Sequence, residues 1–269
     1  MRIDTIVTDL DDTLLNGSAE LSPFTLQMIA ELSRRGIRFL AASGRAASSM
    51  RPFVNLINAG QPYIASNGAQ ILSPDHTVLH EDLFTPEQAR ELIRYFQEKN
   101  IYMQCYRDDY FYFASENENS KRYARQTGMA GKAVNDLYAF VDFSTPKVLS
   151  VAAPDVVEAL YPLIQKDFPD VSFTISKPYF LEAQPKGVSK GSALKWLGER
   201  LGFTPETTMA FGDSLNDLEM LRYTPYGVAM QNARDEVKQA VRYVTDYPNT
   251  QDGLAHFVMT HVLSETEGA

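Results

Sequence analysis

The sequence has little of what an extracellular protein usually needs. It contains one cysteine, Cys105, in 269 residues, so no disulfide can form within the chain. Internal disulfides are typical of oxidising compartments, and their absence favours a reducing one. Cys105 lies in the alternating, strand-like stretch 102–107, where we expect a structural role rather than a nucleophilic one.

Long hydrophobic runs and long basic runs are also missing. The apolar stretch within residues 1–10 is short and is followed by acids, unlike a signal peptide. No stretch approaches the roughly 18 apolar residues of a membrane span. Acidic residues outnumber basic ones by 34 to 25, which argues against a nucleic-acid-binding face. We therefore expect a cytoplasmic protein with no nucleic-acid or membrane partner.

Strand and helix patterns alternate over the first 72 residues. Such alternation predicts βαβ units and a Rossmann-like parallel sheet, which binds ligands at the carboxyl ends of its strands. The expected strands are 3–10, 37–43 and 62–66, and the expected helices are 22–36 and 45–58.

The pattern changes in the middle of the chain. Residues 67–83 read as a hairpin, and aromatic strands mixed with helices follow it. The strand–helix alternation returns near residue 185. We therefore predict an α/β core domain formed by residues 1–83 and 185–269, with an α+β domain, residues 84–184, inserted into it.

Acidic residues follow the first predicted strand. In "IVTDLDDTLL", residues 6–15, Asp9, Asp11 and Asp12 stand within four positions. The pair Asp9 and Asp11 could hold a divalent cation or divide nucleophilic and acid–base roles. A solvated turn rich in Asp fits the same residues equally well.

Polar residues follow two other predicted strands. Ser43 and Gly44 offer a hydroxyl and backbone amides that can receive a phosphate oxygen, although Ser-Gly is also an ordinary turn. Asp213 stands at the tip of the strand predicted at 207–213, and Asn216 and Asp217 stand on the first turn of the helix after it. They suit a hard cation such as Mg²⁺, and they equally suit a capped helix with acids at its positive end.

A lysine begins the helix predicted at 189–202. Lys190 stands at the end of the helix dipole that disfavours a cation, which indicates an anionic partner, and Lys186 is an alternative four residues earlier. All of these groups fall at edges of one predicted sheet and should face one crevice. A carboxylate nucleophile, Mg²⁺, a lysine and hydrogen-bond donors are sufficient for phosphoryl transfer.

These residues resemble the haloacid dehalogenase superfamily of phosphohydrolases, and more narrowly the Cof type with the subclass IIB cap. "DLDDTLL" (9–15), "ASGR" (42–45), "GVSKGSAL" (187–194) and "GDSLNDLEML" (212–221) match its four motifs, with Ser43 in place of the commoner Thr. Residues 226–245, with "DGLAHFV" after them, match the usual Cof tail. The resemblance covers essentially the whole chain.

The resemblance implies a Mg²⁺-dependent phosphatase that acts on small phosphate esters such as sugar phosphates. Asp9 would attack phosphorus and become an aspartyl phosphate, and Asp11 would protonate the leaving alcohol and then activate water. Asp9, the backbone carbonyl of Asp11 and Asp213 would hold Mg²⁺. The phosphate would be held by Leu10, Ser43, Gly44, Lys190 and Asn216.

Other residues receive supporting roles from the same resemblance. Asp217 would support metal-bound water or orient Lys190, Asp12 would be scaffolding, and Asn67 would line the crevice. We expect a raised pKa for Asp11 and an ionised, metal-bound Asp9. The cap would close over the site and select the leaving group.

Three alternatives stay open. Arg45 could contact substrate or form a salt bridge. The tyrosines of the aromatic strands could face the pocket, although packing within the sheet is favoured: Tyr102, Tyr106, Tyr110 and Tyr112. The function could be that of a phosphomutase of the same superfamily, or of a non-enzymatic phospho-acceptor, which lacks both the cap and the second acid.

Overall fold

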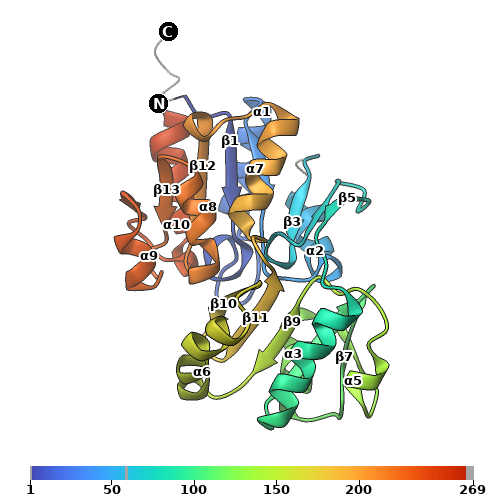
Figure 1. The fold of residues 1–269 in the computed structure, drawn as a ribbon. Coiled ribbons are helices and arrows are strands. Elements are labelled where there is room, and N and C mark those ends of the chain that lie inside the picture. The colour runs from blue at the N-terminus through green and yellow to red at the C-terminus, as the bar shows by residue number, and fades with distance from the viewer. Residues whose placement is uncertain (1, 58–59, 265–269) are drawn as a thin grey trace.

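A five-stranded parallel sheet forms the centre of one half of the molecule (Figure 1). The computed structural model describes residues 2–57 and 60–264. The register pairs Thr8 with both Phe211 and Ala41, so three neighbouring strands end side by side. In sheet order the strands are β14 (Tyr243–Val244), β13 (Tyr226–Ala229), β12 (Thr208–Gly212), β1 (Thr5–Thr8) and β2 (Arg38–Ala41).

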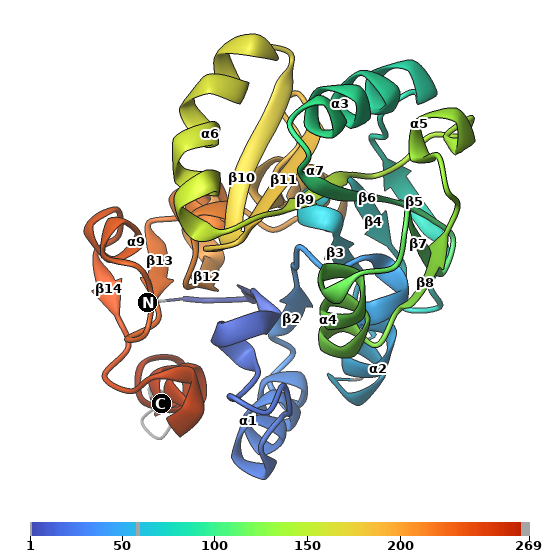
Figure 2. The ribbon, with the colours of Figure 1, turned by 90° about the horizontal axis from the view of Figure 1, so that it is seen from below.

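Helices cover both faces of this sheet. Helix α1 (Pro23–Arg34) packs with α10 (Gly253–Val258), and α7 (Lys190–Leu201) packs with α8 (Leu218–Tyr223). Figure 2 shows α1 and α7 on opposite sides of the sheet. The start of α1 is explained by Ser22, whose side chain accepts a hydrogen bond from the Thr25 amide. Helices α2 (Ala47–Ile57) and α9 (Asp235–Gln239) also belong to this half of the molecule. The helix predicted at 45–58 thus begins two residues later, and residue 58 lies outside the described residues.

The third predicted strand does not extend the parallel sheet as expected. It forms β3 (Tyr63–Ala65), which pairs antiparallel with β4 (Gln70–Leu72), and β5 (Val78–Glu81) is added to β4. One parallel bridge, Ala42 to Ile64, joins β3 to the main sheet. The left-handed turn at 66–68 reverses the chain before a longer parallel pairing can form. The predicted hairpin at 67–83 is confirmed.

A second sheet of six strands fills the other half of the molecule. We call the part from α3 (Pro86–Glu98) to the last strand of this sheet the cap, and the remainder the core. Helices α3 and α6 (Pro154–Asp167) pack on one face of the sheet. In sheet order its strands are β10 (Val171–Lys177), β11 (Phe180–Pro185), β9 (Val148–Val151), β6 (Tyr102–Arg107), β7 (Tyr110–Phe113) and β8 (Ala130–Ala133). The predicted α/β core with an inserted α+β cap is confirmed.

Sequence analysis gave no elements for the segment between β7 and β9. It contains α4 (Glu118–Thr127), β8 and a short α5 (Leu137–Phe140). Helix α4 has clear end signals: Asn117 accepts hydrogen bonds from the amides of Asn119 and Ser120, and Gly128 ends the helix in a left-handed conformation. These signals surround a strongly polar helix, which explains why the search for apolar periodicity missed it.

Alternation along β6 and β7 decides where the aromatic side chains point. Met103 and Cys105 belong to the hydrophobic cluster under α3, together with Tyr112, while Tyr106 belongs to the cluster on the opposite face, near α4. The favoured interpretation, in which the tyrosines pack within the sheet, agrees with this. Burial raises the pKa of Cys105 to about 12, as expected of a structural thiol.

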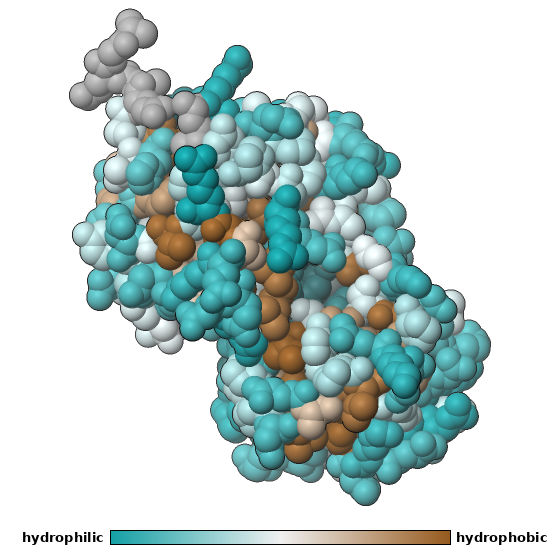
Figure 3. Space-filling model, turned by 60° about the vertical axis from the view of Figure 1, so that its left-hand side comes forward, coloured by the Kyte–Doolittle hydropathy of each residue, from teal (hydrophilic) through white to brown (hydrophobic). Residues whose placement is uncertain are grey.

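Each half has its own main hydrophobic cluster, and a third cluster, formed mostly by cap residues, includes Ala46 of the core. The face drawn in Figure 3 is largely hydrophilic, with hydrophobic side chains exposed near the junction of the halves. Within residues 2–57 and 60–264, none of the helices combines the length and hydrophobicity that crossing a membrane requires.

Gly68 offers a test of how the turn at 66–68 supports the core. A Cβ atom there would lie 2.1 Å from the carbonyl oxygen of Ser189, and its φ is +103°. We expect Gly68→Ala to lower the free energy of unfolding by about 3 kcal/mol or more. Gly36→Ala is the control, since Gly36 has φ of +72° with nothing within 4 Å of its Cβ position and should lose only about 1 kcal/mol. If urea unfolding showed equal losses of unfolding free energy for the two variants, the supporting role of the turn at 66–68 would be contradicted.

Candidate active site

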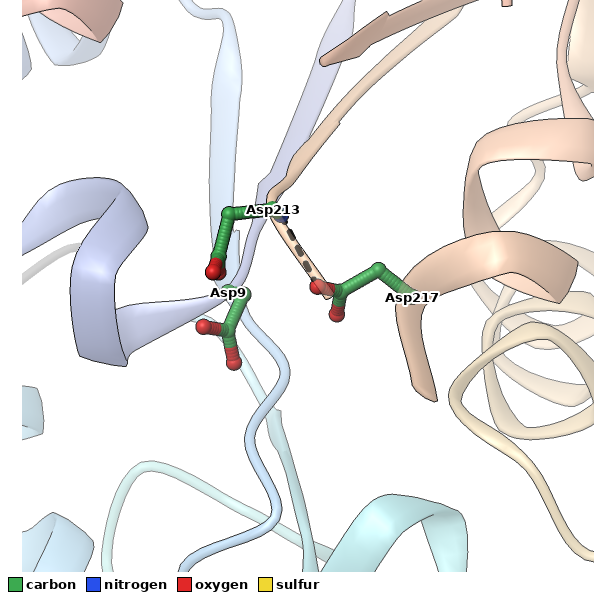
Figure 4. A group of neighbouring side chains, drawn as sticks. All are labelled: Asp9, Asp213 and Asp217. Carbon is green, nitrogen blue, oxygen red and sulfur yellow. Dashed lines mark hydrogen bonds between the residues drawn. The ribbon is translucent and has the colours of Figure 1, made fainter. Parts of the chain in front are cut away.

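Three carboxylates meet at the carboxyl edge of the parallel sheet. Asp9 directly follows β1 and Asp213 directly follows β12, and the parallel register places these ends side by side. Asp217 ends the short 3₁₀ turn Leu215–Asp217. One oxygen from each carboxylate lies within 4.8 Å of the others. Figure 4 shows the three side chains gathered at the ends of the strands. Among the described residues this is the group of acids that fits a metal ion.

Lys190 joins two of these carboxylates. Its Nζ donates to Asp9 Oδ1 at 2.6 Å and to Asp217 Oδ1 at 2.7 Å, and its side chain is fully buried. The other oxygen of Asp217 accepts from the amides of Asp213 and Ser214, each at 3.0 Å. Asp217 therefore holds Lys190 against Asp9. Lys186, the alternative, is exposed and pairs with Asp170 at 2.9 Å.

Burial and charge shift the protonation of this group. Burial raises the pKa of Asp9 to about 7; the charges of Asp217 and Asp11 add to this effect, while Lys190 opposes it. Burial and the charges of Asp217 and Asp9 also raise the pKa of Asp213 well above its ordinary value. One ammonium cannot neutralise three carboxylates, two of them buried and one half-buried, so the cluster lacks positive charge.

The turn after Asp9 positions the rest of this edge. Leu10 is buried at the start of the turn, and Asp12 takes a left-handed conformation with φ of 58°. The Thr13 hydroxyl donates to Asp213 Oδ1 at 2.9 Å and so links the turn to the end of β12. Asp12 is exposed, and its backbone carbonyl accepts from Asn232 at 2.8 Å.

Asp11 is paired with Arg45, which corrects one expectation. Arg45 Nε and Nη2 each donate to a different oxygen of Asp11 at 2.7 Å. Burial alone would raise the pKa of Asp11, but these hydrogen bonds and the charges of Arg45, Lys177 and Lys190 outweigh it and lower the pKa. The predicted raised pKa is therefore wrong for this arrangement, and Arg45 forms the salt bridge that sequence analysis left open.

Ser43, Gly44 and Asn216 line the same cavity as the acids. Asn67 lies behind them: its Oδ1 accepts from Asn216 Nδ2 at 2.9 Å, and its left-handed φ of 56° belongs to the turn after β3. A Cβ on Gly44 would lie 3.0 Å from Asn67 Oδ1, so a side chain would crowd this contact. The structure thus brings all of the predicted site residues to one edge of the sheet.

The cap supplies the other wall of the cavity, and sequence reasoning did not identify the residues that form this wall. Three of its residues come from α4, which was not predicted, and the others lie on or directly beside strands of ordinary appearance. None of the four tyrosines weighed in the sequence lines this cavity. The cap residues are Tyr123, Gln126, Thr127, Lys147, Leu149, Ser176, Lys177, Phe180 and Glu182.

A buried ion pair joins the cap to the core. Lys147 Nζ donates to Glu182 Oε2 at 2.7 Å and to the carbonyl of Gly44 at 2.6 Å. Asn67 Nδ2 also donates to Glu182 Oε2, at 3.3 Å. Two predicted phosphate-site residues, Gly44 and Asn67, are therefore held by cap side chains, so the described arrangement has the cap against the site.

Comparison with known proteins agrees with this geometry. The family model for haloacid dehalogenase-like hydrolases matches residues 6–258. A putative phosphatase of Haemophilus influenzae is 28% identical over 255 residues, covering 95% of this chain and 97% of its own. The solved structure of TM0651 from Thermotoga maritima is 34% identical, with a TM-score of 0.80 and coverage of 95% and 96%.

The cap architecture has a counterpart among solved structures. A haloacid dehalogenase subclass IIB sugar phosphatase superposes with a TM-score of 0.81 over 95% of this chain and 97% of its own, at 21% identity, which shows a shared fold. The family model spans nearly all of the chain, including the motifs that carry the acids and Lys190. The chain therefore belongs to the haloacid dehalogenase-like hydrolases, and it is an enzyme of the phosphatase type.

Proposed function

We propose that this enzyme is a Mg²⁺-dependent phosphatase that hydrolyses small phosphorylated metabolites, such as sugar phosphates, through an aspartyl phosphate on Asp9. The observation that carries the proposal is the buried contact between Lys190 and Asp9 inside a cluster of three carboxylates. A carboxylate nucleophile beside a fixed cation at the edge of a cavity suits attack on a phosphate ester.

The donor set of the cluster fits Mg²⁺. Its ligands would be carboxylate oxygens, and the acids have one ammonium among them to balance their charge. Asp9, Asp213 and the backbone carbonyl of Asp11 would hold the ion, with Asp217 supporting it and fixing Lys190. When bound, Mg²⁺ neutralises negative charge on the phosphate and on the acids. Positive charge there would also favour the ionised form of Asp9 that a nucleophile requires.

In the first half of the reaction, the free oxygen of Asp9 attacks phosphorus and the ester P–O bond breaks. Lys190, Asn216, Ser43 and the amides of Leu10 and Gly44 hold the phosphoryl oxygens. Asp11 gives its proton to the leaving oxygen, so its pairing with Arg45 must loosen before this step.

In the second half, Asp11 is ionised, which is the state that Arg45 favours. It takes a proton from water as the water oxygen attacks phosphorus. The bond between phosphorus and Asp9 then breaks and phosphate leaves. The alcohol has departed by this stage, and the cap, proposed as residues 84–184, limits the entry of other water.

Replacing the two acids tests their roles. We expect Asp9→Asn to lower the release of inorganic phosphate from p-nitrophenyl phosphate by about 10⁴-fold or more, because the nucleophile is lost. Asp11→Asn should also block turnover of alkyl phosphates and retain substrate binding. Asp12→Asn is the matched control, because Asn tolerates the left-handed φ of 58° and the side chain is exposed. Full activity of Asp9→Asn would overturn the assignment.

The raised pKa of Asp9 predicts how metal binding depends on pH. Without metal, folded Asp9 holds a proton that the unfolded chain has lost, so stability falls as the pH rises from 3.8 toward about 7. Mg²⁺ must displace that proton, so its stabilising effect should grow over the same range. The stabilisation by Mg²⁺ should reach about 2.7 kcal/mol when the free Mg²⁺ concentration is 100 times its Kd.

Calorimetry with and without Mg²⁺, at about pH 5 and about pH 8, measures this effect. Asp213→Asn should remove the gain in Tm, and phosphatase activity of the unaltered enzyme should disappear in EDTA. An equal gain in Tm at both pH values would contradict the role of Asp9, and activity after thorough chelation would contradict the metal requirement.

A further inference from the structure

Among the described residues, one cation that lines the cavity has no hydrogen-bond or ion-pair partner. Arg45 is paired with Asp11, Lys147 with Glu182, and Lys190 with Asp9 and Asp217. Lys177 lines the same cavity from the cap, and within the described part of the chain its side chain forms no hydrogen bond or ion pair. The charge of Lys177 helps to lower the pKa of Asp11, but both Asp11 oxygens already accept from Arg45, so the half-buried ammonium keeps its own donors for a ligand.

A strand irregularity directs Lys177 into the cavity. Phe173 and Ile175 lie in the hydrophobic cluster under the cap helices, and strict alternation along β10 would send Lys177 the same way. The pairing of β10 with β11 shifts register between Ile175 and Lys177. As a result, Ser176 and Lys177 both line the cavity. Bulges of this kind redirect side chains next to active sites.

Among the polar groups near Lys177, the acceptors are occupied, and mainly hydrogen-bond donors stay free for a ligand. Glu182 already accepts from Lys147, Asn67 and Ser176, so its oxygens are occupied. The Tyr123 hydroxyl accepts from Tyr106 at 2.8 Å, and no acceptor for its own proton occurs among the described residues. The cap wall therefore offers a free ammonium and a free hydroxyl donor, both suited to acceptor oxygens.

We infer that Lys177 determines specificity by binding a second anionic group, a carboxylate or a second phosphate, on the leaving-group part of the substrate, with Tyr123 donating to the same part. The inference rests on the proposed phosphatase function. It narrows the substrate class from phosphate monoesters in general to those that carry a further negative charge. A charge-assisted hydrogen bond of this kind is worth about ten- to a hundredfold in kcat/KM.

Matched substrates test the inference with Mg²⁺ present. Glycerol 3-phosphate is compared with 3-phosphoglycerate, and fructose 6-phosphate with fructose 1,6-bisphosphate, so that each pair differs by one anionic group. We expect the charged member of at least one pair to be preferred by about tenfold or more, and the pair that shows it identifies carboxylate or phosphate. Lys177→Met should remove most of that preference.

Lys121→Met is the matched control. Lys121 is a cap lysine that pairs with Glu116 on the surface and does not line the cavity, so the preference should persist. An equal loss for neutral and charged substrates in Lys177→Met would overturn the inference, since Lys177 would then act on the transferred phosphoryl group. Hydrolysis without any preference would also overturn it and leave the phosphatase proposal standing. No hydrolysis of any ester, p-nitrophenyl phosphate included, would contradict the proposed function itself.

Discussion

The contact of one buried lysine with two buried carboxylates organises this molecule. Lys190 enters from the first turn of α7 and meets Asp9 from β1 and Asp217 from the turn after β12. Removing one partner from such a buried pair typically costs about 3–5 kcal/mol, because the remaining charge is left uncompensated. The packing of α7 against the sheet and the chemistry at the strand ends therefore depend on the same three side chains.

The excess of negative charge in that cluster connects structure with catalysis. Three carboxylates and one ammonium can share a buried site only if protons or a cation balance them, and the raised pKa values of Asp9 and Asp213 express this. The cap contributes a second balanced pair, Lys147 with Glu182, and attaches it to the Gly44 loop of the core. Ionic contacts thus fix both walls of the cavity, and within the described part of the chain Lys177 forms no hydrogen bond or ion pair.

The core and its strand-end residues could be predicted from the sequence because each follows an apolar strand, and parallel strands end at one edge. The pairing of Arg45 with Asp11 could not be predicted from the sequence, because it joins residues that are 34 positions apart. Helix α4 was not predicted because it is short and polar. Tyr123 lies in this helix, so its place in the cavity was not predicted either. The position of Lys177 depends on a bulge in β10, which alternation in sequence does not reveal.

The phosphorylation of Asp9 itself tests the account most directly. Asp11→Asn enzyme is mixed with Mg²⁺ and p-nitrophenyl phosphate, whose leaving group needs no proton, and is then quenched in acid and digested for mass spectrometry. Since Asp11 is absent as the base for the second step, the intermediate should accumulate. The account predicts one phosphoryl group on Asp9. Phosphate found on another residue, or turnover without any phosphorylated peptide, would contradict it.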